Sequence, residues 1–96
     1  MPSEKTLQAF IKKECKAAGI LCYKFASPAH RGVPDLILVG PTGRVIFVEV
    51  KSPTGRGKLS PLQEHTIKQL RENNATVYVT NDKRAVTTII KLLTDK

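Results

Sequence analysis

GVPDLILVGPTGRVIFVEVK, residues 32–51, is the stretch that decides the fold. It contains two short apolar runs, 36–39 and 45–48, separated by the turn-forming sequence Gly-Pro-Thr-Gly at 40–43. Short β-branched or aliphatic runs on either side of a segment rich in glycine and proline are typical of two strands joined by a turn. We therefore predict an antiparallel hairpin here.

Three charged residues stand at one end of this predicted hairpin. Asp35 begins the first run, whereas Glu49 and Lys51 end the second, so antiparallel pairing brings all three to the same end of the sheet. Strand side chains alternate between two faces, so a slip of one residue moves Asp35 to the other face. We predict the register that pairs Val39 with Val45, because it sets Asp35 opposite Glu49.

The predicted pair of carboxylates indicates a metal site. Two carboxylates a few ångströms apart repel each other in an apolar setting, and a bound divalent cation removes that repulsion. The alternative is that Glu49 and Lys51 form a surface ion pair, which is the ordinary role of an isolated E-x-K on a strand. The Pro34-Asp35 pair upstream and the parity of the strands favour the metal site.

The composition predicts one soluble globular domain, residues 1–96, with a polyanionic partner. The chain has 96 residues, of which 41% are hydrophobic, enough for a single core. Sixteen lysines and arginines against eight aspartates and glutamates give a net charge of +8, which favours nucleic acid; a merely basic surface is the alternative. We find neither a membrane-length apolar run nor a signal core, and expect a cytoplasmic protein of a bacterial or phage-infected cell. Cys15 and Cys22 form no disulfide framework or ligand cluster, so we expect them in or near the core.

A first helix is predicted over residues 3–18, ended by Gly19. Leu7, Ile11 and further apolar residues recur there at helical spacing. The same spacing places Glu4 within the apolar stripe, so we expect its carboxylate to face the sheet near the site. The alternative role for Glu4 is to complement the helix dipole in the first turn.

The remaining segments alternate between strands and helices. We predict a strand over 21–25, a helix from Ser60 to about Asn73, a strand over 75–79 and a last helix opened by residues 81–82. The order helix, strand, strand, strand, helix, strand, helix builds an α/β fold, a mixed sheet with helices packed on it.

The helix that begins near Ser60 carries a specific start signal. Ser60 is the N-cap, Pro61 the first helical residue and Gln63 the capping-box partner. Capping alone explains Gln63, but its direction also brings an amide toward Lys51. The buried stripe of this helix is expected to contain Leu62, Thr66, Ile67 and Leu70.

Two loops beside the predicted site carry cations. The loop over 27–34 contains His30, which is either an ordinary exposed histidine or a general base or ligand. The loop over 52–58 is rich in glycine and cations, and its alternative role is that of a passive connector. The residues that we expect to contact a nucleic-acid backbone are Arg31, Arg56, Lys58 and Ser60.

Taken together, these motifs resemble the PD-(D/E)xK nuclease superfamily and, within it, the stand-alone VRR-NUC domain, the virus-type replication and repair nuclease module. The resemblance covers nearly the whole chain and rests on Glu4, GVPD at 32–35, EVK at 49–51 and GKLSPLQ at 57–63. It implies a restriction-endonuclease-like core, a mixed four-stranded sheet flanked by helices, which agrees with the predicted element order.

The resemblance also implies a metal centre. Asp35 and Glu49 would bind Mg²⁺ or Mn²⁺, with the main-chain carbonyl of Val50 as a further ligand, and hard oxygen ligands suit those ions. Glu4 would reach a metal through water or bind a second ion. These assignments concern positions at which the chain shows no departure from the motif.

The activity implied by the resemblance is that of a DNA endonuclease. Lys51 would orient or deprotonate the attacking water, and Gln63 would position Lys51 or the nucleophile. By analogy with compact relatives, we expect a homodimer that cuts branched DNA, such as four-way junctions or flaps, in replication, repair or recombination. A non-catalytic DNA-binding module and a hydrolase or transferase for another phosphorylated substrate remain open, although the chain has no Walker loop or G-x-G-x-x-G.

Overall fold

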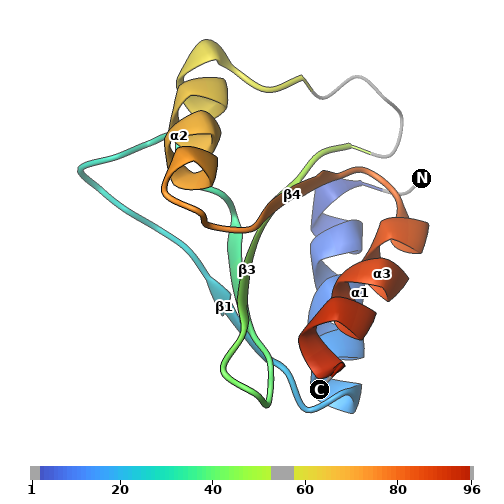
Figure 1. Ribbon diagram of the computed structural model, residues 1–96. Helices are drawn as coiled ribbons and strands as arrows, with labels where there is room; N and C mark the ends of the chain where they lie inside the picture. Colours follow the sequence, from blue (N-terminus) through green and yellow to red (C-terminus); the bar gives the residue numbers. More distant parts are fainter. Residues whose placement is uncertain (1–2, 53–57, 96) are drawn as a thin grey trace.

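The computed structural model describes residues 3–52 and 58–95, which form a sheet with helices on both faces (Figure 1). The sheet has four strands in the order β1-β2-β3-β4. The elements along the chain are α1 (Glu4–Ala17), β1 (Leu21–Lys24), β2 (Leu36–Val39), β3 (Val45–Val50), α2 (Pro61–Glu72), β4 (Val77–Thr80) and α3 (Lys83–Thr94). The predicted element order is confirmed. Within the described residues, no helix is both long and apolar enough to cross a membrane.

The hairpin of β2 and β3 has the predicted register. Val39 lies opposite Val45 in this antiparallel pair, so extending the pairing one residue beyond β2 sets Asp35 opposite Glu49. Gly43 closes the turn with a φ of +90°, a conformation that glycine adopts without strain. β4 pairs with β3 in parallel, which makes the sheet mixed as predicted.

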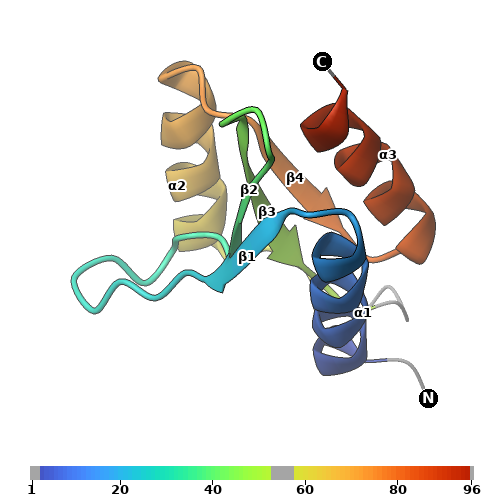
Figure 2. The same cartoon turned by 90° about the horizontal axis from the view of Figure 1, so that it is seen from below.

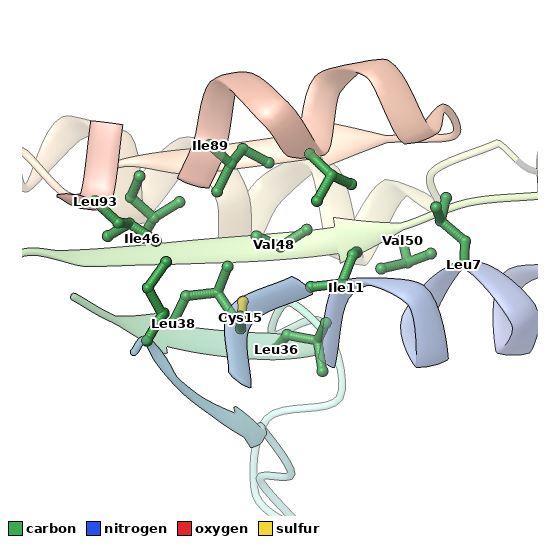
Figure 3. Packing of buried hydrophobic residues seen from close by; sticks show 12 residues of the cluster. Leu7, Ile11, Cys15, Leu36, Leu38, Ile46, Val48, Val50, Ile89 and Leu93 are labelled. Atoms are coloured by element: carbon green, nitrogen blue, oxygen red, sulfur yellow. The ribbon is translucent and has the colours of Figure 1, made fainter. Parts of the chain in front are cut away.

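One face of the sheet is covered by two helices over its central strands. α1 and α3 lie side by side on this face, opposite α2 (Figures 1 and 2). The residues of β2 and β3 that point toward them are all at most 1% exposed: Leu36, Leu38, Ile46, Val48 and Val50. Leu7 and Ile11 from α1, with Ile89 and Leu93 from α3, pack against these strands (Figure 3). This face holds the hydrophobic core.

The two cysteines lie at the edge of this core. Cys15 is buried and Cys22 half-buried, and both are free thiols, as predicted. A hydrogen bond that the Cys15 thiol donates to the neighbouring Cys22 side chain, together with burial, raises the pKa of Cys15. The thiol of Cys15 therefore stays protonated and serves as a small core side chain.

The other face of the sheet is covered only in part, because α2 packs mainly against β4. Ile67 of α2 is buried, but Leu62 is 49% exposed. The prediction that Leu62 belongs to a buried stripe is therefore wrong. The apolar side chains of β1 on this face, Leu21 and Tyr23, are 53% and 57% exposed.

Helix ends account for the small shifts in element boundaries. Ser3 caps α1 by accepting a hydrogen bond from the N–H of Thr6, and Gly19 follows the helix with a φ of +74°. At the end of α2, Asn74 has a φ of +67°, and the N–H of Ala75 donates to the carbonyl of Leu70. These residues close the helix, so β4 begins at 77 rather than at the predicted 75.

Candidate active site

Asp35, Glu49 and Lys51 come together at one end of the β2–β3 hairpin, as predicted. Alternation along β3 points Glu49 and Lys51 to the same face of the sheet as α2. The Nζ atom of Lys51 lies 3.1 Å from Oε2 of Glu49. The backbone N–H of Val50 donates to Oδ2 of Asp35 at 2.9 Å, which holds this carboxylate against β3. The site therefore combines two carboxylates and one ammonium group.

The backbone of Asp35 is held from the other side by β1. The N–H of Phe25 donates to the carbonyl oxygen of Asp35 at 2.7 Å, one residue beyond the last regular pair of the two strands. Neither this contact nor the N–H of Val50 as a donor is predicted in the sequence analysis above. The predicted strand over 21–25 contained the signal for the first, because pairing of that strand with β2 extends to Asp35.

The first turn of α2 completes the site through Gln63. Its Nε2 donates to Oε2 of Glu49 at 2.9 Å, and its Oε1 accepts a hydrogen bond from Lys51 Nζ at 3.1 Å. The same Oε1 accepts the N–H of Ser60 at 3.0 Å, and Ser60 Oγ accepts the N–H of Gln63 at 3.1 Å. Gln63 is thus both the capping-box partner and a member of the site. The orientation of its amide is fixed because Oε1 accepts from two donors, whereas Nε2 donates to a carboxylate acceptor.

Glu49 is an ionisable group in an apolar position. Only 1% of the residue is exposed. Burial raises the pKa of its carboxyl, the charge of Asp35 adds to that effect, and the hydrogen bond from Lys51 opposes it. Its second oxygen, Oε1, is buried and has no hydrogen-bond partner in the described parts of the chain. A buried acceptor without a partner costs free energy unless something outside the chain satisfies it.

The donor set fits a hard divalent cation. The unpartnered Oε1 of Glu49 and the carboxylate of Asp35 offer oxygens of the kind that Mg²⁺ and Mn²⁺ prefer. Across residues 3–52 and 58–95, no cluster of three or more histidine, cysteine or acidic side chains suited to a metal is found. Two carboxylates agree with Mg²⁺, which keeps several water ligands and commonly uses one or two carboxylates.

The predicted inward direction of Glu4 is wrong, because the structure leaves this side chain exposed. The first buried residue of α1 is Leu7, which lies near Val50 at the site end of β3 (Figure 3). Glu4 lies one turn before it, at the start of the helix, and forms no hydrogen bond or ion pair with the described residues. Its role as a metal ligand through water stays a prediction.

The predicted nucleic-acid contacts lie on the surface. Arg31, Lys58 and Ser60 are exposed, and Arg56 lies outside the described residues. The hydroxyl of Ser60 is occupied as the N-cap of α2, so its remaining capacity for a phosphate is as a donor. His30 is exposed in the loop before β2, as its ordinary role requires.

Comparison with known proteins agrees with this geometry. The family model of the VRR-NUC domain matches residues 2–83. The chain belongs to the VRR-NUC family. A solved structure of a VRR-NUC domain is similar to this fold, with a TM-score of 0.82 and 29% identity over 95% of this chain and 97% of that one. The VRR-NUC chain is also 39% identical, over 62 residues, to "Putative nuclease p44" of Acyrthosiphon pisum secondary endosymbiont phage 1, covering 65% of this chain and 67% of that protein.

Proposed function

We propose that this VRR-NUC chain is a metal-dependent DNA endonuclease that hydrolyses phosphodiester bonds. The observation that carries the proposal is the buried, unpartnered Oε1 of Glu49 beside Asp35 and Lys51. A purely structural ion pair between Glu49 and Lys51 would leave that oxygen unsatisfied at a cost in stability. A cation bound by the two carboxylates would satisfy it.

The residues of the site divide the work of hydrolysis. Asp35 and Glu49 would hold Mg²⁺ or Mn²⁺, with the carbonyl of Val50 as a further ligand. The ion, when bound, polarises the scissile phosphate and lowers the pKa of water. Lys51 orients or deprotonates the attacking water and stabilises the negative charge that develops on the phosphate. Gln63 keeps Lys51 in place, because its Oε1 accepts the hydrogen bond from Nζ.

DNA is the substrate that the charge supports best. The net charge of +8 attracts a polyanion, and the exposed Arg31 and Lys58 precede the two segments that bring Asp35 and Gln63 to the site. The phage relative is named "Putative nuclease p44", which agrees with a nucleic-acid substrate. Selectivity for four-way junctions or flaps is the finer part of the proposal and rests on analogy with compact relatives.

The proposed active form is a homodimer, because cutting both strands of a branch requires two sites. The incompletely covered face of the sheet supports this form. Its apolar side chains lie in adjacent cross-strand pairs, Leu21 with Val39 and Tyr23 with Ile37. None of them is charged, so two chains of charge +8 can meet there without opposing cations at the centre of the contact.

Cleavage of labelled DNA tests the activity. We expect four-way-junction, flap and linear duplex substrates to be cut with Mg²⁺ or Mn²⁺ and left intact in EDTA. Glu49→Gln and Lys51→Met each reduce the rate by at least about 10²-fold, since each removes charge from the site. His65→Ala is the control, because this exposed histidine lies on α2 outside the network of Gln63.

The outcomes separate the proposed endonuclease from the other classes. Salt-sensitive binding with no cleavage by any variant would establish a DNA-binding module instead. Cleavage that survives Glu49→Gln would move the chemistry to other residues. Equal cleavage of linear and branched DNA would keep the nuclease and remove the structure selectivity.

A further inference from the structure

Gly32 is the point at which the loop before β2 meets helix α2. The residue is buried. A Cβ atom at this position would lie 2.5 Å from Oγ1 of Thr66 and 2.6 Å from the carbonyl oxygen of Leu62. Both distances are well inside van der Waals contact. The loop therefore approaches the backbone of α2 more closely than any residue with a side chain permits.

The backbone conformation gives no other reason for glycine here. Among the described glycines, positive φ occurs at Gly19 and Gly43. Gly32 is not one of them, so alanine fits its backbone angles and only the close approach to α2 excludes it. His30 and Val33, which flank Gly32 in the loop, line an open groove along α2 with Thr66 and Leu70.

The loop and the helix that meet at this contact each continue to a residue of the site. On the loop side, Pro34 is fully buried and delivers Asp35 to the N–H of Val50. On the helix side, Leu62 is followed directly by Gln63, whose amide binds Glu49 and Lys51. A movement of the loop away from α2 therefore changes the position of Asp35 relative to Glu49.

We propose that Gly32 is a positioning residue of the active site, which sets the separation of the two metal-binding carboxylates by holding the Asp35 loop against the first turns of α2. The inference rests on the proposed function, because it assigns Gly32 to the metal site of that function. Gly32 touches neither substrate nor metal. It acts only through Asp35 on one side and the helix that carries Gln63 on the other.

The test is metal affinity in Gly32→Ala, measured by calorimetric titration with Mn²⁺ in the absence of DNA. The added methyl group cannot pass the Leu62 carbonyl, so the loop shifts outward. We expect Mn²⁺ to bind about tenfold more weakly, the size of effect seen when groups that orient metal ligands are lost. The concentration of Mg²⁺ that gives half-maximal cleavage is expected to rise by a similar factor.

The matched control is Gly40→Ala at the other end of β2. A Cβ there would overlap the carbonyl oxygen of Leu93 at the end of α3, an obstacle of the same kind on the opposite side of the sheet. Gly40→Ala should lower thermal stability and leave Mn²⁺ affinity within about twofold, because Asp35 and Glu49 are not displaced. An equal loss of affinity in both variants would show a general loss of packing and overturn the assignment.

A second substitution tests the contact itself. Thr66→Ala removes one of the two obstacles, so the double variant Gly32→Ala/Thr66→Ala should recover part of the lost affinity while the Leu62 carbonyl still prevents full recovery. The double variant also carries the test if Gly32→Ala does not fold. Wild-type affinity in Gly32→Ala overturns the inference, whereas absence of Mn²⁺ binding and cleavage in the wild type overturns the proposed function instead.

Discussion

The two faces of the sheet differ in coverage and in chemistry. On one face, α1 and α3 bury every residue of β2 and β3 that points toward them, and all of these residues are apolar. On the other face, α2 covers the β4 side, Leu21 and Tyr23 stay exposed, and the carboxylates of Asp35 and Glu49 lie in the same layer. One face supplies the core, and the other supplies the site.

This difference shows how a 96-residue chain holds buried charge without losing its fold. Glu49 lies on a central strand, where its backbone pairs with Val79 of β4 and directly follows Val48, which pairs with Leu36 of β2. Its side chain is buried by α2, yet the surface beside it is open at β1. A complete layer of helices on this face would cover the apolar surface at β1 that we assign to the dimer contact. Partial coverage is therefore a condition of the proposed dimer.

The largest expected effect comes from a substitution on the uncovered face of the sheet. Tyr23→Glu places a charge at the centre of the uncovered apolar face, and a two-fold contact would bring two such charges together. We expect the dimer dissociation constant to rise by at least about 10³-fold, because burying unpaired charge costs several kcal/mol. Sedimentation velocity at micromolar concentration measures the change.

Lys24→Glu is the control for that experiment. Lys24 is the next residue of β1, is exposed, and points to the opposite face. It should leave the dimer intact although it changes the net charge more than Tyr23→Glu does. A monomeric wild-type chain would contradict the homodimer, and an intact Tyr23→Glu dimer would assign the interface to a different surface.

A smaller effect is expected when the two faces are compared within one strand by the free energy of unfolding. Val48 and Val45 both belong to β3, but Val48 is 0% exposed on the covered face and Val45 is 40% exposed on the other. Val48→Ala should lower the free energy of unfolding by about 2 kcal/mol, whereas Val45→Ala should lower it by less than about 0.5 kcal/mol. Urea denaturation in the Tyr23→Glu background measures both without a partner over Val45. Equal losses would contradict the assignment of stability to one face.

The sequence predicts the parts of this structure that depend on local pattern. Alternation along 45–51 together with a short turn leaves few registers, so the opposition of Asp35 and Glu49 was predicted. The capping box at Ser60 is likewise local, since its hydrogen bonds join residues three positions apart.

The errors concern how far each helix extends over the sheet. Glu4 follows the helical spacing of the stripe, but it lies one turn before the first packed residue, and no local signal gives the edge of the sheet. Leu62 is exposed for the related reason that α2 covers mainly β4. The dual role of Gln63 depends on the distance between the start of α2 and the end of β3. The sequence indicates that Gln63 caps the helix and that its side chain is directed toward Lys51, but it does not give this distance.

The smallest effect concerns the charge of Glu49 in metal-free protein. Burial raises the pKa of its carboxyl in the folded chain above the ordinary value of 4.5, which applies to the unfolded chain. At a pH between the ordinary and the raised pKa, the folded chain therefore binds more protons than the unfolded chain. Stability from this group is therefore fully present below pH 4.5 and is lost as the pH rises through the raised value. In EDTA, Glu49→Gln should exceed the wild type in free energy of unfolding at pH 8, and the difference should shrink as the pH falls, because protonation removes the same charge. Urea denaturation of both proteins across this range isolates Glu49 from the other titrating groups. A difference that grows toward acid pH would mean that ionised Glu49 stabilises the fold through Lys51, and would contradict the view that this charge is held for a cation.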